Sequence, residues 1–366
     1  MAATKRALSL LRTYNVPGWA SKIRCAPKDY VELARKGTPI HRWELPGVPD
    51  SFELSIKRDD LTGYDGCKIR KLEFIFAEAL EQKSTCVITC GSLNSNHCRA
   101  TAVACKRLGL DCHLLLRSHD QEGDSKKLTS NLLLNRLHGA NCYMVPYESL
   151  DGGLNARLEK LSKELSKQGE RPFIIPLGGS NSVGTFGILN AFQELIEQGV
   201  FSDFDDIVLA TSSGGTLAGM AIANYLTGEK LRVHGICVSD NSDYFYEHIA
   251  KSLEAYHIRA TKTRQICDIM DGYKGEGYAK ITPEDQDTLV EICQTTGVLL
   301  DSVYTVKAVK GMVTEMNDNP KRFKGNRVLF LHTGGTYGIF DGSILQSKRL
   351  TENNAKVWKD IDELTL

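Results

Sequence analysis

Residues 208–219 read VLATSSGGTLAG, an apolar run followed by a polar, glycine-rich turn and a second apolar stretch. This pattern predicts a buried strand that leads through a tight turn into a helix. Such a turn leaves free backbone N–H groups at the positive end of the helix, where anions bind. The chain contains neither a P-loop pattern ending in Gly-Lys-Ser/Thr nor a G-x-G-x-x-G fingerprint. A single phosphate is therefore the favoured ligand, and a tight turn without a ligand is an equal alternative.

The same alternation of strand-like and helix-like segments recurs along most of the chain, with no internal repeat. Strands are predicted at 52–57, 85–90, 112–116, 173–176, 207–211, 233–238 and 327–332, and helices at 70–81, 95–108, 154–167, 187–197, 217–226 and 284–296. The polar stretch 119–127 is predicted to be a surface loop. This rhythm predicts an α/β fold in which parallel sheets are covered on both faces by helices. Active sites in such folds lie at the carboxyl ends of the strands.

Composition restricts the kind of protein. The chain has 366 residues, of which 42% are hydrophobic and 25% charged, so it is a folded enzyme-like chain with room for about two domains. Its 45 basic residues balance its 45 acidic ones, which argues against a nucleic-acid or anionic-lipid partner. No apolar run approaches the roughly 18 residues that span a bilayer, and we expect no membrane segment.

The cysteines and the N-terminus bear on the compartment. Eleven scattered cysteines without a C-x-x-C pair or zinc-ligand spacing argue against a disulfide framework and a metal site. A reducing compartment, the cytoplasm, is the natural interpretation. Residues 1–28 contain six Lys and Arg and no acidic residue, which is also the composition of a weak mitochondrial transit peptide. A solvated basic arm explains that composition equally well.

Lys68 is a candidate reactive lysine. It follows the turn-like segment 59–67 and opens a predicted helix whose first turn carries Lys68, Arg70 and Lys71. Three cations there oppose the helix dipole, so another interaction must compensate them. A lysine beside a phosphate-binding loop is what a pyridoxal phosphate enzyme requires, because its amine forms a Schiff base with the cofactor. The alternative is an exposed, basic helix start.

Several other polar residues fit both a functional and a purely structural role when each is considered alone. Segment 94–97, Asn-Ser-Asn-His, precedes an alanine-rich helix and could hold a carboxylate or simply cap that helix. Tyr278 and Tyr304 could line a site or pack as ordinary aromatics, and His97 and His332 could be structural histidines. Their joint occurrence with the glycine-rich loops favours a site.

Together these motifs resemble the family of D-cysteine desulfhydrases and 1-aminocyclopropane-1-carboxylate deaminases, which are fold-type-II pyridoxal phosphate enzymes. The resemblance runs from about Gly37 to Gly342. Its landmarks are Thr38–Trp43, Ile56–Gly63, Lys68–Glu73, Asn94–His97, Gly178–Asn181, Asp301–Tyr304 and His332–Gly335. Two departures occur: Asp65-Gly66-Cys67 stands where the family usually has Gly-Gly-Asn, and Asn94 often corresponds to Gln.

The resemblance implies a role for each matching residue. Lys68 corresponds to the Schiff-base lysine, Asn96 to the partner of the cofactor's phenolic oxygen and Thr333 to the partner of its ring nitrogen. Ser95 and His97, with Asn96 beside them, correspond to the substrate-carboxylate site. The catalytic set would be Lys68, Ser95, Tyr278 and Tyr304, with both tyrosines lining the substrate pocket, and the phosphate cradle would be Ser213, Gly214, Gly215 and Thr216.

Two positions separate activities within the family. The ring-opening deaminases carry Glu and Leu where this chain has Thr305 and Thr333, whereas the desulfhydrases carry Ser or Thr at both. A hydroxyl facing the ring nitrogen leaves it largely unprotonated, and the weaker electron sink suits β-elimination. The resemblance therefore implies a lyase that converts D-cysteine to pyruvate, hydrogen sulfide and ammonia. The alternatives are 1-aminocyclopropane-1-carboxylate deaminase, L-cysteate sulfo-lyase, D-serine dehydratase, or a noncatalytic protein that binds pyridoxal phosphate.

The resemblance also implies an architecture. We expect two domains, each with a twisted, mainly parallel sheet flanked by helices. A small domain of residues 72–180 would be inserted into a large one made of 1–71 and 181–366, with pyridoxal phosphate in the cleft between them. A homodimer is expected from the family.

Overall fold

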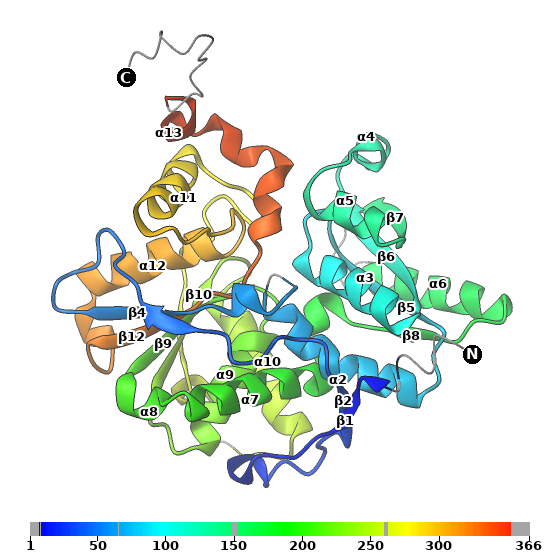
Figure 1. The fold of residues 1–366 in the computed structure, drawn as a ribbon, viewed down its shortest axis with the longest axis horizontal. Coiled ribbons are helices and arrows are strands. Elements are labelled where there is room, and N and C mark those ends of the chain that lie inside the picture. The colour runs from blue at the N-terminus through cyan, green and yellow to red at the C-terminus, as the bar shows by residue number, and fades with distance from the viewer. Residues whose placement is uncertain (1–6, 8, 65, 148–152, 260–262, 353–366) are drawn as a thin grey trace, which may run out of the picture.

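The computed structural model describes residues 7, 9–64, 66–147, 153–259 and 263–352, which form two helix-flanked sheets side by side (Figure 1). The larger sheet has the strand order β11 (Asp268–Met270), β10 (Arg232–Cys237), β9 (Asp206–Thr211), β12 (Arg327–Leu331), β4 (Glu53–Lys57) and β3 (Ile40–Arg42). The smaller sheet has the order β7 (Asn141–Pro146), β6 (Asp111–Ser118), β5 (Cys86–Ser92) and β8 (Pro172–Ile174). All neighbouring strands in these sheets are parallel except β3 and β4. The predicted fold class is thus confirmed.

Helices cover both faces of both sheets. In chain order they are α2 (Lys68–Glu81), α3 (Asn96–Leu108), α4 (Gln121–Lys126), α5 (Ser130–Leu137), α6 (Asn155–Lys167), α7 (Ser182–Glu197), α8 (Val200–Asp203), α9 (Gly215–Leu226), α10 (Ser242–Ala255), α11 (Pro283–Thr296), α12 (Thr305–Asp318) and α13 (Lys348–Thr351). Helices α7, α9 and α10 pack on one face of the larger sheet, and α11 and α12 on the other. Helices α2, α3 and α5 cover one face of the smaller sheet, and α6 the other.

Burial on both faces explains why the strands read as continuous apolar runs. In β9, Ile207 and Leu209 contact the core under α7 and α9, whereas Val208 and Ala210 contact the core under α11 and α12. Successive side chains of a strand point to opposite faces, so every position needs an apolar residue when both faces are covered. This is the physical basis of the strand prediction.

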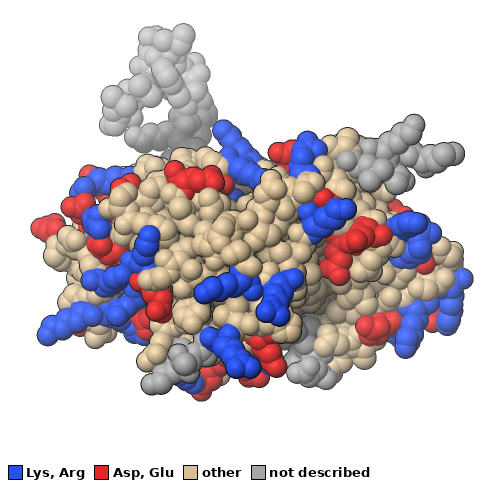
Figure 2. Space-filling model, turned by 90° about the horizontal axis from the view of Figure 1, so that it is seen from below, with Lys and Arg blue, Asp and Glu red and all other residues tan. Residues whose placement is uncertain are grey.

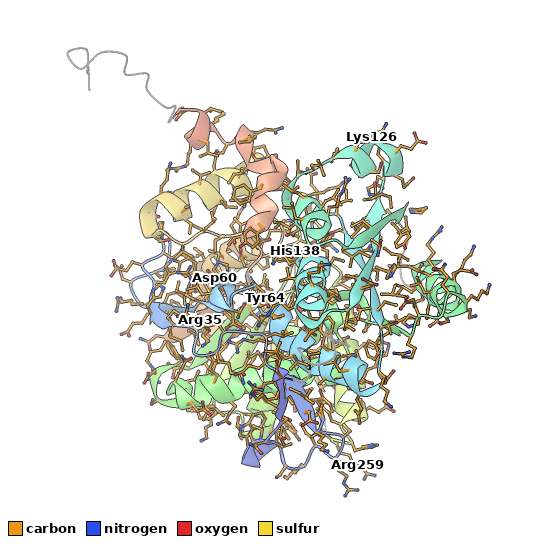
Figure 3. The ribbon with its side chains drawn as sticks, turned by 45° about the vertical axis from the view of Figure 1, so that its right-hand side comes forward. Arg35, Asp60, Tyr64, Lys126, His138 and Arg259 are labelled. Carbon is orange, nitrogen blue, oxygen red and sulfur yellow. The ribbon has the colours of Figure 1, made fainter. Side chains whose placement is uncertain are left out.

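Several predicted boundaries differ from the structure. Each predicted strand and helix overlaps an observed element. The predictions do not include β3, β7, β11, α4, α5, α8, α10, α12 and α13, nor the short strands Leu11–Thr13 and Asp29–Val31. The predicted surface loop at 119–127 is wrong, because Gln121–Lys126 forms α4 and the Asp120 carboxylate accepts a hydrogen bond from the Gly123 N–H. Lys126 lies at the outer end of the smaller unit (Figure 3).

The predicted domain boundaries stay a prediction. Helix α2 packs against α7 of the larger unit and against α3 of the smaller one, so residue 72 falls inside a helix that both units share. The β1–β2 pair (Leu11–Thr13 and Asp29–Val31) also lies against α2.

The surface shows no concentration of one charge in the view of Figure 2, where Lys and Arg are interspersed with Asp and Glu. None of the helices in the described ranges is both long and apolar enough to cross a membrane.

A buried ionic cluster joins the strands of the larger sheet at the end remote from the glycine-rich loops. His234 is fully buried, its Nε2 lies 2.7 Å from Asp206 Oδ1, and its Nδ1 lies 2.9 Å from Asp268 Oδ2. Burial alone would lower the pKa of His234, but hydrogen bonds to both carboxylates outweigh it and raise the pKa. Both ring nitrogens therefore donate, and the imidazolium cross-links β9, β10 and β11.

We predict that His234→Gln lowers the free energy of unfolding by about 3 kcal/mol at about pH 6, because the buried Asp206 and the partly buried Asp268 lose the cation that they share. A raised folded-state pKa means that the His234 contribution is complete below its unfolded pKa and is lost as pH rises through the folded pKa. The difference between variant and wild type should therefore shrink at alkaline pH. Urea denaturation at several pH values measures it, with the exposed His41→Gln as control. An equal loss at every pH would contradict a charged His234.

Candidate active site

The predicted loops meet in the cleft between the two units. The loop after β9, the loop after β5 and the residues after β12 all lie at carboxyl ends of strands, as expected for a parallel fold. A cavity of about 690 Å³ is lined by Lys68, Ser95, His97, Ser213, Tyr278 and Tyr304 among others. A smaller adjoining cavity is lined by Lys68, Asn96, Gly214, Thr216 and Thr333 among others. The structure thus brings the sequence-predicted residues together, with Gly215 between Gly214 and Thr216 in the same loop.

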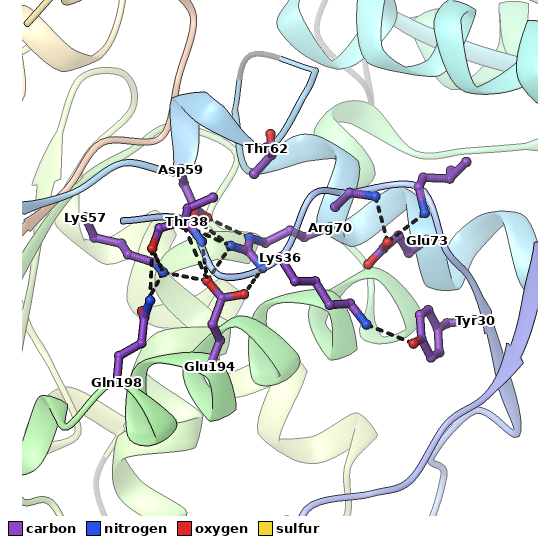
Figure 4. A network of polar contacts seen from close by, with 12 residues as sticks. Tyr30, Lys36, Thr38, Lys57, Asp59, Thr62, Arg70, Glu73, Glu194 and Gln198 are labelled. Atoms are coloured by element: carbon purple, nitrogen blue, oxygen red, sulfur yellow. Dashed lines mark hydrogen bonds and ion pairs between the residues drawn. The ribbon is translucent and has the colours of Figure 1, made fainter. Parts of the chain in front are cut away.

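The first turn of α2 is held by a buried ionic network (Figure 4). Arg70 Nη2 lies 2.7 Å from Asp59 Oδ1, and Arg70 Nη1 lies 3.0 Å from Glu194 Oε2. Lys57 also donates to Glu194. Although burial raises the pKa of Glu194, hydrogen bonds from Arg70 and Lys57 outweigh it and lower the pKa to about 2. These ion pairs offset the unfavourable interaction between the Arg70 cation and the positive end of the helix dipole.

Lys68, two residues earlier, points into the cleft. Its Nζ lies 3.2 Å from Ser213 Oγ and 3.5 Å from the carbonyl oxygen of Gly178. Burial lowers the pKa of Lys68, which favours the neutral, nucleophilic amine. Gly178 has φ +67°, and a Cβ there would lie 2.7 Å from Ser213 Oγ, so only glycine leaves room for this contact.

Lys71 is a second buried amine at the site, and the sequence alone did not indicate a role for it. It is buried, and its Nζ lies 3.4 Å from Ser180 Oγ, which donates to Ser213 Oγ at 2.8 Å. A Cβ placed on Gly215 would lie 2.9 Å from Lys71 Nζ, so the amine stands directly beside the first residue of α9. No described residue forms an ion pair with Lys71. Burial first, and then the nearby Lys68, lower its pKa well below the usual range.

Ser95 and His97 occupy the start of α3. Ser95 Oγ caps the helix by accepting from the Cys98 N–H at 3.1 Å, which leaves its own hydroxyl proton for a ligand. Thr89 donates its hydroxyl proton to the Ile175 carbonyl oxygen, so its Oγ must accept from His97 Nε2 at 2.9 Å. Burial lowers the pKa of His97 well below its usual range. The neutral ring therefore presents Nδ1 as an acceptor, and a carboxylate would have to be held by Ser95 and the backbone N–H groups.

The two tyrosines form a pair over the cavity. Tyr278 and Tyr304 have their hydroxyl oxygens 2.6 Å apart, and Ser92 Oγ lies 3.3 Å from the Tyr278 hydroxyl. Burial raises the pKa of both tyrosines, most strongly that of Tyr304. Both are consequently protonated at neutral pH, and Tyr278 can donate a proton into the larger cavity.

The two threonines that separate activities in the family lie in different surroundings. Thr305 is fully buried and donates to Asp301 Oδ1 at 2.7 Å, so its hydroxyl is used within the loop. Thr333 lines the smaller cavity, and its carbonyl oxygen accepts from the Cys67 N–H at 3.1 Å. Thr333 is therefore the hydroxyl available to a ligand there.

The positions that depart from the family pattern can be followed only in part, because Asp65 lies outside the described residues. Cys67 is buried, and its Sγ lies 3.6 Å from Thr216 Oγ1. Gly66 between them agrees with the family; it has φ +129°, and a Cβ there would lie 2.4 Å from the carbonyl oxygen of Thr333. Asn94 donates from Nδ2 to Asp341 Oδ2 at 2.7 Å and so links the smaller unit to the larger one. Sequence reasoning also missed Arg117, whose guanidinium lies 4.8 Å from the ring centre of Tyr147 where both line the larger cavity.

These residues fit pyridoxal phosphate. The start of α9 offers backbone N–H groups, glycines that leave space, and the buried Lys71 amine without an acidic partner among the described residues, all of which suit a phosphate. Lys68 supplies the amine that the cofactor's aldehyde requires, and Asn96 and Thr333 supply polar groups around its ring.

Comparison with known proteins supports the same cofactor. The model of the family described as pyridoxal-phosphate dependent enzyme matches residues 31–334. The chain is 43% identical over 338 residues to the bifunctional D-cysteine desulfhydrase/1-aminocyclopropane-1-carboxylate deaminase, mitochondrial, of Arabidopsis thaliana, covering 90% of this chain and 84% of the relative. It is 39% identical to a putative 1-aminocyclopropane-1-carboxylate deaminase of Thermotoga maritima, covering 87% of this chain and 99% of the relative. The crystal structure of an ACC deaminase homologue superposes with a TM-score of 0.77 at 33% identity, covering 90% of this chain and 99% of the other.

The chain therefore belongs to the family of pyridoxal-phosphate dependent enzymes. Its cofactor is pyridoxal phosphate, as its sequence motifs predicted.

We predict that Lys71→Met weakens binding of inorganic phosphate to the cofactor-free protein by about tenfold or more, because a charged hydrogen bond is lost. Since burial and the nearby Lys68 lower the pKa of Lys71, phosphate binding should be accompanied by proton uptake at Lys71. Titration calorimetry in buffers of different ionisation enthalpy measures both quantities. The exposed Lys106→Met is the matched control. Unchanged phosphate affinity in Lys71→Met would show that this amine does not face the anion.

Proposed function

We propose that this enzyme is a carbon–sulfur lyase that converts D-cysteine and water to pyruvate, hydrogen sulfide and ammonia. The observation that carries the proposal is the lining of the smaller cavity. Its described lining residues include Thr333, Thr211, Thr216 and Ser213 but no carboxylate. Asp301 lies close by, but its two oxygens accept hydrogen bonds from Thr305 and from the N–H groups of Val303 and Tyr304. A cofactor ring that meets hydroxyls instead of a carboxylate is a weaker electron sink.

A weak electron sink favours substrates with a good leaving group. Bound pyridoxal phosphate withdraws electrons from the α-carbon of an amino acid, which allows its proton to leave. In β-elimination the electron pair then expels the β-substituent at once, so little charge has to be stored. Thiolate is such a leaving group, whereas a cyclopropane carbon is a poor one.

Each protein group has a proposed task. Lys68 holds the cofactor through its amine and, once released, accepts the α-proton of the substrate. The Ser95 hydroxyl and the N–H groups of Asn96 and His97 hold the substrate carboxylate. Tyr278, hydrogen-bonded to Tyr304, gives its proton to the departing sulfur as the carbon–sulfur bond breaks, and water later converts the three-carbon product to pyruvate and ammonia.

The second candidate is 1-aminocyclopropane-1-carboxylate deamination. It is favoured by the names of the two relatives above, one of which carries both activities. L-Cysteate, D-serine and a noncatalytic role remain as further alternatives that the same assay separates. A homodimer and a cytoplasmic or mitochondrial location stay predictions; the Arabidopsis relative is named as mitochondrial.

We predict that the purified holoprotein shows the visible absorbance of lysine-bound pyridoxal phosphate and releases sulfide and pyruvate in equal amounts from D-cysteine. Lys68→Ala should lose the band and reduce turnover to background, because the amine that would bind the cofactor's aldehyde is then missing. L-Cysteine, L-cysteate, D-serine and 1-aminocyclopropane-1-carboxylate are the comparison substrates. Turnover of D-cysteine by Lys68→Ala at the wild-type rate would overturn the mechanism, and preference for the cyclopropane substrate would favour the second candidate.

We predict further that Tyr278→Phe lowers kcat for D-cysteine by about a hundredfold, because the sulfur then leaves without a proton donor. The loss should be much smaller for β-chloro-D-alanine, since chloride leaves without being protonated. Steady-state kinetics with both substrates measure this, and Tyr143→Phe, on the exposed strand β7, is the control. Equal losses for the two substrates would exclude proton donation by Tyr278.

A further inference from the structure

Asn131 is a fully buried residue of α5 whose side chain is hydrogen-bonded to residues of the candidate site. Its Nδ2 lies 2.8 Å from the carbonyl oxygen of Asn94 and 2.9 Å from Oδ1 of Asn96. A backbone carbonyl can only accept a hydrogen bond, so Asn131 must direct its NH₂ group at Asn94. The second hydrogen of the same NH₂ group then points to Asn96, which must present its side-chain oxygen.

This contact determines which end of Asn96 faces the cavity. With Oδ1 turned to Asn131, the Nδ2 of Asn96 is turned the other way, and it lies 2.9 Å from the position that a Cβ on Gly335 would take. Asn96 lines the smaller cavity together with Lys68 and Thr333. The amide therefore offers a donor, and not an acceptor, to whatever occupies the cavity.

We propose that Asn131 is a positioning residue that holds Asn96 as a hydrogen-bond donor to the phenolic oxygen of pyridoxal phosphate. The inference rests on the cofactor-binding role proposed for Asn96. Without Asn131 the Asn96 amide is free to make a half-turn, which would place an oxygen against the phenolic oxygen. Two acceptors would then face each other, and the cofactor would be held less tightly.

Hydrogen bonds between the two units hold the neighbours of Asn131 in place. Ser130, its neighbour in α5, donates from Oγ to the carbonyl oxygen of Tyr337 at 2.9 Å. Asn94, whose carbonyl orients Asn131, is bonded through its own side chain to Asp341. Both partners lie in η7 (Thr336–Asp341) of the larger unit, so the orientation of Asn96 is set by a connected set of bonds and not by one contact alone.

The test compares two ligands of the cofactor-free protein. Pyridoxal phosphate has the phenolic oxygen, and 3-deoxypyridoxal phosphate lacks it. Asn131→Ala should weaken binding of pyridoxal phosphate by about tenfold and leave binding of the deoxy analogue unchanged, since a donor to a charged oxygen is lost only in the first case. Asn131→Asp should weaken it further, because a carboxylate accepts the Asn96 N–H and turns the amide over.

Asn135→Ala is the matched control. Asn135 lies one turn further along α5, is also fully buried, and makes no side-chain hydrogen bond to a described residue. Asn135→Ala should therefore show how much the loss of a buried asparagine from α5 weakens the binding of both ligands. It should not change the ratio of their affinities. In an Asn96→Ala background, Asn131→Ala should add no further loss.

Three results would overturn the proposal: equal weakening of both ligands by Asn131→Ala, the same ligand-specific loss in Asn135→Ala, or a full additional loss in the Asn96→Ala background. These measurements use binding and no substrate. Failure of D-cysteine turnover would therefore overturn the proposed lyase function but not the inference about Asn131. If Asn131→Ala weakens binding of both ligands equally, the inference about Asn131 is overturned and the proposed lyase function is unaffected.

Discussion

The buried pairing of Arg70 with Asp59 and Glu194 is the constraint on which the candidate site depends. It places a helix start, with its unfavourable cations, in the interior between two sheets. Removing one partner would leave a buried charge without compensation, which costs about 3–5 kcal/mol. Because Lys68 lies only two residues before Arg70, the same ion pairs that stabilise the fold also fix the position of the reactive amine.

Close helix packing completes this arrangement. A Cβ on Gly187 of α7 would lie 1.9 Å from the carbonyl oxygen of Arg70, and a Cβ on Gly219 of α9 would lie 2.5 Å from Cβ of Ile188. Glycine at these two positions allows α7 to approach both α2 and α9. The start of α9, where we propose that the cofactor's phosphate binds, is thereby brought beside Lys68 and Lys71.

The sequence predicted the fold class well because both faces of the sheets are covered, which leaves long apolar runs in β5 and β9. It missed α5, whose short segment contains two asparagines that are poor helix formers. The site loops were recognisable from their glycine and hydroxyl residues and from the family resemblance. Lys71 and Asn131 were not assigned roles, because their neighbours Gly215 and Asn96 come from distant parts of the chain and only the tertiary structure brings them together.

The hydrogen bonds that join α5 and Asn94 to η7 also have a mechanical consequence. They connect the two units on one side of the cleft, and residues of both units line the larger cavity. A relative rotation of the units that keeps the α5 bonds would pivot on that side. Such a rotation would change the width of the larger cavity, which both units line, and would let small molecules enter and leave.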